Sequence, residues 1–211
     1  MKLWHCADTR SFRVLWALEE IGLSYDIELM PFPPRAKVPG YLEINPLGTV
    51  PTFNDGSVTM TESSAIVHYL GTKYPESGLV PLPSDPAYGA WLNWMYLSDA
   101  TLTFPQTIVL RYGTFEPDRA ANAADDYARW FLSRLKHVER TVSQGDWLCG
   151  DRFTGADITV GYALLLANYL KLDVRFPDAV RAYWARLQDR PAFLAAKKVQ
   201  RIELAELLGT A

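Results

Sequence analysis

Apolar side chains near the start of the chain follow two different periods. Residues 24–30 carry them at alternate positions, as a half-buried strand does, and residues 2–5 are a second, apolar-rich strand candidate. Between these stretches, residues 10–22 repeat apolar positions at helical spacing and end at Gly22, a common helix stop. The pattern predicts a βαβ unit, whose two strands are expected to be parallel.

Prolines dominate the next stretch. Five of them fall within residues 31–46, so we expect no long helix there and only a short one around residues 39–44. Two short apolar segments, residues 49–53 and 57–60, then flank an Asn-Asp-Gly turn signal. We therefore expect these two segments to form an antiparallel hairpin.

A helix is predicted from Thr61 onward, because apolar residues recur at helical spacing and the threonine stands where a cap is needed. Residues 79–85, rich in proline, form the predicted linker between two domains. The first, residues 1–78, is a small α/β domain, and the second, residues 86–211, is all-helical because no period-two run appears in it. Its expected helices cover residues 86–112, 117–143, 154–170, 176–188 and 191–208.

The charge balance excludes one class of partner. The chain has 21 Lys and Arg against 24 Asp and Glu, without a basic excess in either half, so we expect no nucleic acid partner. No apolar run is long enough to span a bilayer and no secretory leader is evident, so we expect no membrane association and a cytoplasmic location. The two cysteines, Cys6 and Cys149, lack a CxxC motif or a histidine cluster and predict neither disulfides nor a metal site.

Two short polar features are candidate binding sites. Pro51 cannot donate to a sheet ladder, and a cis Val50–Pro51 bond would turn the backbone groups of Val50 outward, where an extended peptide can pair with them. Glu62 and Ser63 open a helix whose N-terminus suits a carboxylate, while the Glu62 carboxylate suits an ammonium group. The alternative is purely structural: Thr61 caps the helix and Glu62 complements its dipole.

Four segments together resemble the cytosolic glutathione transferase superfamily, in particular bacterial, theta- and beta-like members with a hydroxyl at the active site. They are NPLGTVPTF…DG…TESSAI, RVLWALEEIGLSYD, LCGDRFTGADITVGYAL and DRPAF. The resemblance spans essentially the whole chain and implies an α/β thioredoxin-like N-terminal domain of order βαβαββα, followed by an all-α helical C-terminal domain. In the third segment Thr154 and Asp157 match a capping box, whose role is fold stability.

The resemblance implies that glutathione is a co-substrate held by the N-terminal domain. Val50, in a cis-Pro51 turn, would bind its cysteinyl backbone, and the start of the helix would hold its γ-glutamyl end. A basic side chain, Lys37 or Arg35, would meet the glycine carboxylate. The glutathione-binding residues expected are Lys37, Thr49, Val50, Pro51, Glu62 and Ser63.

Glutathione reacts as its thiolate, because the thiol itself is a poor nucleophile. Lowering the thiol pKa by roughly 2 units takes about 2.7 kcal/mol, and one charge-assisted hydrogen bond supplies about 1.5–3 kcal/mol. A single hydroxyl therefore suffices. In theta-like relatives the activating serine lies four residues before the arginine that opens the first helix. Counted from Arg13, that position is Thr9, with Ser11 as the alternative, and the same alignment buries Cys6.

The resemblance also places the second substrate on the first long helix of the C-terminal domain. Pro105 predicts a kink in this helix near residues 99–101. Arg111 either favours an electrophile with a carboxylate or phenolate or makes a surface ion pair. The candidate residues of the electrophile pocket are Tyr96, Thr103, Phe104, Arg111 and Tyr112.

The expected function is that of a glutathione S-transferase that attacks a hydrophobic, aromatic electrophile in detoxification. Two alternatives stay open: a glutathione-dependent peroxidase or thiol-lyase activity, and a non-catalytic, glutathione-binding stress or regulatory protein. The superfamily further implies a homodimer. No metal cofactor is expected.

Overall fold

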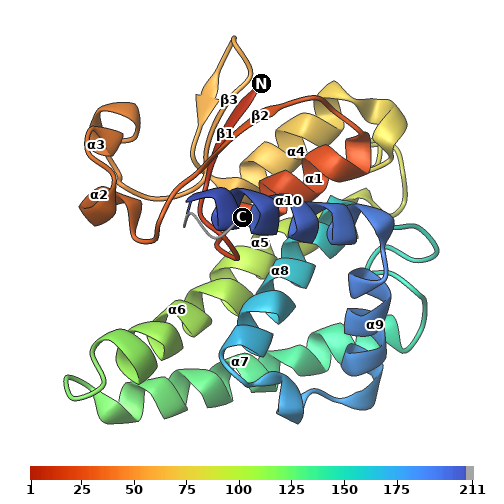
Figure 1. Ribbon diagram of the computed structural model, residues 1–211. Helices are drawn as coiled ribbons and strands as arrows, with labels where there is room; N and C mark the ends of the chain where they lie inside the picture. Colours follow the sequence, from red (N-terminus) through yellow and green to blue (C-terminus); the bar gives the residue numbers. More distant parts are fainter. Residues whose placement is uncertain (208–211) are drawn as a thin grey trace. The chain divides into compact units, whose positions relative to one another are not determined.

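The computed structural model describes the backbone of residues 1–207 and the side chains of residues 1–120 and 122–201 (Figure 1). The chain divides into two compact units, one made of Met1–Ser77 with the residues from Gln188 onward, and the other of Gly78–Leu187. The sequence pattern had assigned the last helix to the second domain. The difference arises because this helix packs with the first unit.

The first unit contains a four-stranded mixed sheet in the order β2-β1-β3-β4. β1 pairs in parallel with β2, where Leu3 lies opposite Ile27, and antiparallel with β3, where Leu3 lies opposite Phe53. The β3–β4 hairpin is antiparallel. The strands cover Lys2–His5 (β1), Asp26–Leu29 (β2), Thr52–Asn54 (β3) and Thr59–Met60 (β4). Both the parallel pair and the hairpin predicted from the sequence are confirmed, and the sheet is thioredoxin-like.

Helix α1, Phe12–Ile21, connects the two parallel strands and ends where the sequence predicts. Gly22 takes a φ of 76°, and its N–H donates to the carbonyl of Leu18 at 3.0 Å. A residue with a side chain adopts this left-handed conformation at a cost, which is why glycine ends the helix.

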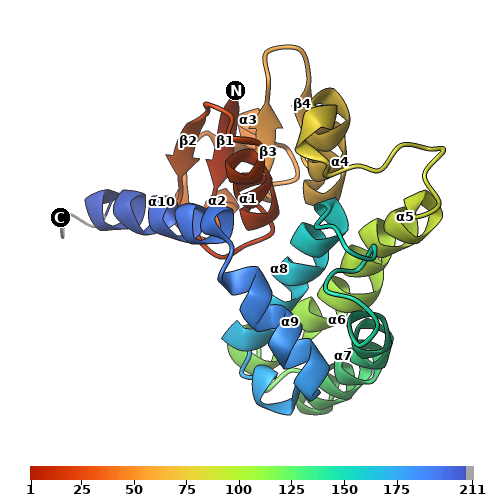
Figure 2. The ribbon, with the colours of Figure 1, turned by 90° about the vertical axis from the view of Figure 1, so that its right-hand side faces the viewer.

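Helix α10, Pro191–Leu207, lies beside α1 in both ribbon views (Figures 1 and 2). The ring of Phe193 meets that of Trp16 edge-on with centroids 4.9 Å apart. At the start of the helix, Arg190 donates two hydrogen bonds to the carboxylate of Glu20, at 2.6 and 2.7 Å. Apolar packing and a bidentate ion pair therefore join the two ends of the chain in one unit.

The proline-rich segment forms two short helices where the sequence predicted one. α2 covers Pro34–Lys37 and α3 covers Tyr41–Ile44. Pro34 starts α2 because a proline fits the first helical position, and Gly40, with a φ of 78°, separates the two turns. The prediction missed α2 because it treated the prolines only as helix breakers.

Helix α4, Ser63–Lys73, begins one residue later than predicted, with Glu62 rather than Thr61 at the N-cap. The carbonyl of Glu62 accepts the first helical hydrogen bond, from Ile66 N–H at 2.9 Å. The prediction that Thr61 caps this helix was therefore wrong, because the extended backbone continues through Glu62. A short 3₁₀ turn, η1, Pro75–Ser77, follows the helix.

The regular elements of the second unit are all helices in the part that the structure describes, as predicted (Figure 2), and Trp147 and Gly150 form an isolated β-bridge in a loop. The helix predicted over residues 86–112 is interrupted by a π-helical stretch, Ser98–Thr103, next to Pro105. A proline lacks the N–H of the regular ladder, so the interruption falls where the kink was expected. The elements are α5 (Tyr88–Leu97), η2 (Ser98–Thr103), α6 (Phe104–Leu110), η3 (Arg111–Phe115), α7 (Ala121–Val142), α8 (Gly155–Tyr169), η4 (Asp173–Arg175) and α9 (Asp178–Gln188).

The predicted capping box at the start of α8 is confirmed. The backbone N–H of Thr154 donates to Oδ2 of Asp157 at 2.8 Å. The other carboxylate oxygen accepts the N–H of Leu148 at 3.0 Å and the hydroxyl of Tyr183 at 2.8 Å. Asp157 is fully buried, so these donors replace the water that its carboxylate loses.

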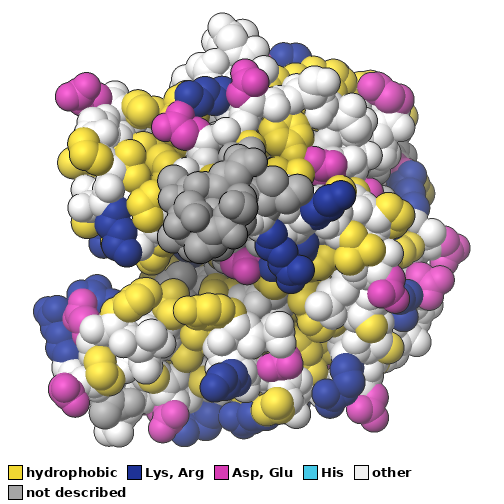
Figure 3. Space-filling view, viewed as in Figure 1, with side chains coloured by type: hydrophobic (Ala, Val, Ile, Leu, Met, Phe, Trp, Pro, Cys, Tyr) yellow, Lys and Arg dark blue, Asp and Glu magenta, His cyan; other side chains and the backbone are white. Residues whose placement is uncertain are grey.

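Charges of both signs are interspersed on the face drawn in Figure 3. None of the helices within residues 1–207 combines the length and the apolar character that a membrane span requires. In the described part of the chain, no group of three or more His, Cys, Asp or Glu side chains is placed to hold a metal ion.

Candidate functional site

The loop between β1 and α1 brings the two candidate hydroxyls together. Thr9 is half-buried, and its Oγ1 donates to the carbonyl of Cys6 at 2.8 Å. The Oγ of Ser11 lies 2.9 Å from Oγ1 of Thr9 and is completely buried. Of the two hydroxyls proposed from the sequence, Thr9 is thus the one that solvent reaches.

His5, the last residue of β1, was not among the residues proposed from the sequence, although it contacts Ser11. Its Nδ1 lies 2.7 Å from Ser11 Oγ, and its Nε2 lies 3.1 Å from Oε1 of Gln200 on α10. Burial lowers the pKa of His5 to about 4, so the imidazole is neutral at pH 7. The alternation of β1, which buries Leu3 and His5 on one face, was the signal that could have found it.

Cys6 does not supply a thiolate of its own. The side chain is fully buried in an apolar cluster with Met30, Tyr41 and Val50. Burial raises the pKa of its thiol to about 12, because the charged form would lose its hydration. The thiol pKa of Cys149 is raised to about 11 for the same reason.

The Val50–Pro51 peptide bond is cis, as the resemblance to glutathione transferases implies. Among the described residues, neither the N–H nor the carbonyl of Val50 takes a hydrogen-bond partner. The preceding carbonyl, that of exposed Thr49, is held by the Tyr41 hydroxyl at 2.6 Å and by Nδ2 of Asn45 at 2.9 Å. The segment is therefore fixed from one side and open at Val50.

The start of α4 carries a buried positive charge. Ser63 is 2% exposed, and its Oγ accepts a hydrogen bond from Nη1 of fully buried Arg13 at 3.0 Å. Glu62 is exposed at the N-cap. The free N–H groups of the first helical turn add partial positive charge at the same place. This corner is electrostatically suited to an anion, and the carboxylate of Glu62 at its rim is suited to a cation.

Lys37 and Arg35 lie on α2, where both side chains are exposed. They line a surface hollow of about 330 Å³ together with Val38 and Glu43. Gly48 approaches this helix closely, since a Cβ on it would lie 2.7 Å from the Cβ of Arg35. Two cations are therefore available here, within the first unit.

The five residues proposed for the electrophile pocket differ in their placement on the second unit. Tyr96 and Phe104 are exposed, with 72% and 54% of their surfaces accessible. Thr103 is fully buried and its hydroxyl donates to the carbonyl of Ser98 at 2.7 Å.

Arg111 forms an exposed ion pair with Glu116, its Nη2 lying 3.1 Å from Oε1 of the glutamate. Its guanidinium also lies 5.4 Å from the ring centre of Tyr112. Two roles were considered for Arg111 from the sequence, a pocket cation and a surface ion pair, and its contacts match the surface ion pair. A charge held this way is screened by water and salt.

A thioredoxin-like unit with an open backbone edge at Val50, joined to an all-helical unit, defines a class of two-domain proteins. The N-terminal domain family of glutathione S-transferases matches residues 9–73, and their C-terminal domain family matches residues 106–191. The chain is 30% identical to Glutathione S-transferase 3 of Zea mays over 195 residues, covering 86% of this chain and 85% of the maize protein. It is 26% identical to Glutathione S-transferase 3 of Schizosaccharomyces pombe over 217 residues, covering 94% and 87%.

Solved structures agree. A glutathione transferase from Methylococcus capsulatus superposes with a TM-score of 0.82 at 28% identity, covering 95% of this chain and 98% of that one. A sphingomonad glutathione S-transferase complexed with glutathione superposes with a TM-score of 0.83 at 25% identity, with the same coverage of both chains. The chain belongs to the glutathione S-transferase family. It is therefore an enzyme, a glutathione S-transferase.

Proposed function

We propose that this transferase binds glutathione on its first unit and uses the Thr9 hydroxyl to stabilise the thiolate, which then attacks a hydrophobic, aromatic electrophile. The observation that carries the proposal is the difference between the two loop hydroxyls. Thr9 is half-buried, whereas Ser11 is fully buried behind it and bonded to His5 at 2.7 Å. A ligand sulfur can therefore approach Thr9 and not Ser11.

The free energy required is within reach of this arrangement. Ionising a thiol at neutral pH takes about 2.7 kcal/mol of preferential stabilisation, and one hydrogen bond to a charged acceptor contributes about 1.5–3 kcal/mol. Because a charged acceptor takes a stronger hydrogen bond than a neutral one, the hydroxyl proton of Thr9 can leave the Cys6 carbonyl, 2.8 Å away, for the charged sulfur.

The remaining groups match the rest of the tripeptide. The open N–H and carbonyl of Val50 are suited to the cysteinyl backbone, and the buried Arg13 beside Ser63 is suited to the γ-glutamyl carboxylate. Glu62 would take the ammonium group, and Lys37 would take the glycine carboxylate. The sphingomonad relative solved with glutathione supports a shared binding mode.

The exposed rings of Tyr96 and Phe104 support an aromatic second substrate, because aromatic faces stack on one another. Phe104→Ala is expected to raise KM for an aryl halide and to leave KM for glutathione unchanged. Val174→Ala, an exposed apolar change in the same unit, is the matched control. Equal effects of the two substitutions would remove Phe104 from the pocket.

The decisive experiment titrates the ultraviolet absorbance of the bound thiolate. Thr9→Val should raise the thiol pKa of bound glutathione toward that of free glutathione, whereas Thr9→Ser should keep it low. Thr72→Val, an exposed threonine of the same unit, controls for the loss of a hydroxyl. An unchanged pKa in Thr9→Val would eliminate Thr9 as the activating residue.

Turnover against aryl halides, hydroperoxides and aryl ethers would then distinguish transfer from peroxidase and lyase activities. Glutathione binding without turnover of any of these substrates would favour the non-catalytic alternative. The homodimer and the cytoplasmic location stay predictions.

A further inference from the structure

An unbroken line of hydrogen bonds joins Thr9 to helix α10. Thr9 Oγ1 lies 2.9 Å from Ser11 Oγ, which lies 2.7 Å from Nδ1 of His5. The other nitrogen of His5 lies 3.1 Å from Oε1 of Gln200, whose Nε2 donates to Oδ1 of Asp8 at 2.6 Å. His5 and Ser11 are fully buried and Gln200 is 2% exposed, so water does not compete for the bonds among these three residues, whereas Thr9 and Asp8 at the two ends are half-buried. All five residues belong to the first unit.

Asp8 determines which way the amide of Gln200 points. The backbone N–H of Asp8 can only donate, and it meets Gln200 Oε1 at 3.2 Å. The carboxylate of Asp8 accepts from Gln200 Nε2 and from Nζ of Lys197 at 2.5 Å. Turning the amide by half a rotation would set donor against donor and acceptor against acceptor. The carbonyl oxygen of Gln200 therefore faces His5.

This orientation determines the tautomer of His5. An amide oxygen only accepts, so Nε2 of His5 carries the ring proton and donates it to Gln200. In the neutral imidazole Nδ1 then has no proton and accepts the hydroxyl of Ser11. The hydroxyl of Ser11 has a single proton, which it donates to Nδ1 of His5. Its oxygen is left as an acceptor for the N–H of Cys6 at 3.3 Å and, at 2.9 Å, as a second acceptor beside the Cys6 carbonyl for the single proton of Thr9.

We propose that Gln200 and His5 are positioning residues that set the direction of the hydrogen bonds reaching Thr9, so that Ser11 accepts from the activating hydroxyl and never donates to it. This inference rests on the proposed role of Thr9 in activating glutathione. In this direction Ser11, like the Cys6 carbonyl, competes with the sulfur for the one proton of Thr9. If Gln200 no longer holds the ring proton on Nε2, the proton can occupy Nδ1 instead and donate to Ser11. Ser11 can then donate its own proton to Thr9, and a hydroxyl that accepts a hydrogen bond is a stronger donor.

The first measurement is the tautomer itself, from nitrogen-15 NMR of the imidazole rings in the whole protein. The chain has three histidines, so His68→Gln and His137→Gln assign the signal of His5. We expect the neutral Nε2–H form with a bare Nδ1, with and without glutathione. A Nδ1–H signal for His5 would overturn the proposal, and this measurement needs neither a substituted site nor activity.

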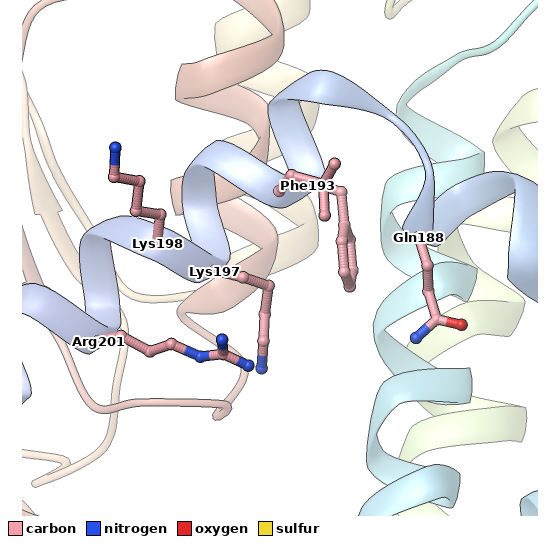
Figure 4. A pocket seen from close by; sticks show the side chains of 6 residues that line it. Gln188, Phe193, Lys197, Lys198 and Arg201 are labelled. Carbon is pink, nitrogen blue, oxygen red and sulfur yellow. The ribbon is translucent and has the colours of Figure 1, made fainter.

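The second measurement is the thiol pKa of bound glutathione in Gln200→Met, which keeps the length of the side chain but removes the amide. We expect this pKa to fall by several tenths of a unit, and the fall to disappear when Thr9→Val is added. Lys198→Met is the control, because Lys198 leaves α10 on the side away from Lys197 (Figure 4).

The outcomes separate the two hypotheses. An unchanged or raised thiol pKa in Gln200→Met, with a clear effect of Thr9→Val, would overturn the positioning role and leave the activation by Thr9 intact. No effect of Thr9→Val, with the Nε2–H tautomer observed, would overturn the proposed function while the direction of the hydrogen bonds stands.

Discussion

Arg13 on α1 donates a hydrogen bond from Nη1 to Oγ of Ser63 at 3.0 Å, with both residues buried. In the sequence, Arg13 is only the reference point from which the position of Thr9 is counted. The structure places its charge at the first residue of α4, where an anion is expected to bind. A residue that seemed to belong to the helix interior thus contributes to the electrostatics of the proposed glutathione site.

Arg13→Met should weaken glutathione binding by about 10- to 100-fold or somewhat more, since one charge-assisted hydrogen bond is worth about 1.5–3 kcal/mol. The loss should appear in KM or in calorimetric Kd and much less in kcat, because the anion it attracts is remote from the sulfur. Ser63→Ala should reproduce part of the effect. A glutathione affinity unaffected by Arg13→Met would place the γ-glutamyl carboxylate elsewhere.

Acid should destabilise the fold through His5. Its pKa is about 4 when folded and 6.5 in the unfolded chain, chiefly because burial penalises the charged ring. Between these values the unfolded state binds the extra proton, so the free energy of unfolding falls as the pH falls, by up to about 1.4 kcal/mol per unit. Urea unfolding measured from pH 7 to pH 4 tests this. The dependence of the free energy of unfolding on pH should be weaker in His5→Gln and unchanged in His137→Gln.

Replacing the carboxylate of the capping box should destabilise the second unit. In Asp157→Asn an NH₂ group replaces one oxygen and faces buried donors, each of which costs about 1–3 kcal/mol when left unpaired. We expect a loss of about 2–4 kcal/mol in urea unfolding. Asp151→Asn removes the same charge from an exposed neighbour and should change stability little. Comparable losses in both variants would contradict the assignment.

Tyr41 should matter for the position of the open backbone edge. Its hydroxyl donates to the Thr49 carbonyl at 2.6 Å and lies 2.9 Å from Oγ1 of Thr52. Tyr41→Phe should cost about 1–3 kcal/mol of stability and raise KM for glutathione, because the carbonyl before Val50 loses a donor. Tyr127→Phe, at an exposed site of the second unit, should do neither. Stability loss without any change in KM would limit Tyr41 to a structural role.

Cys6 should be chemically silent in the native protein. With a pKa of about 12 and no exposed surface, its thiol is neither ionised nor accessible. Iodoacetamide at pH 8 should label it only after denaturant is added, and Cys6→Ala should retain transferase activity. Rapid native labelling of this residue, followed by loss of turnover, would instead indicate that Cys6 takes part in the reaction.

Local periodicity carried most of the fold prediction. The alternation in residues 24–30, the glycine stop at Gly22 and the Asn-Asp-Gly turn each depend on near neighbours, so a sequence window contains the relevant information. The cap of α4 was misplaced by one residue and the short helix α2 was missed. In both cases the residue type alone was used, threonine as a helix cap and proline as a helix breaker, whereas the backbone conformation decides which role the residue takes.

The site was harder to predict than the fold. Thr9 and Ser11 follow from their distance to Arg13, and the choice between them stays a prediction supported by the burial of Ser11. His5 was missed although its strand register was readable. Gln200 was out of reach, because it contacts His5 across 195 positions and nothing near it in the sequence signals that contact.

The contacts of α10 with β1, α1 and the loop between them also determine when that loop is completed. A ribosome makes β1, α1 and the loop that carries Thr9 long before it adds Phe193 and Gln200, since Gln200 follows His5 by 195 positions. Until then the buried nitrogen of His5 lacks its acceptor and the ring of Trp16 lacks its cover. The nascent polypeptide can therefore form its sheet early, yet the loop that carries Thr9 gains these contacts only after α10 has been made.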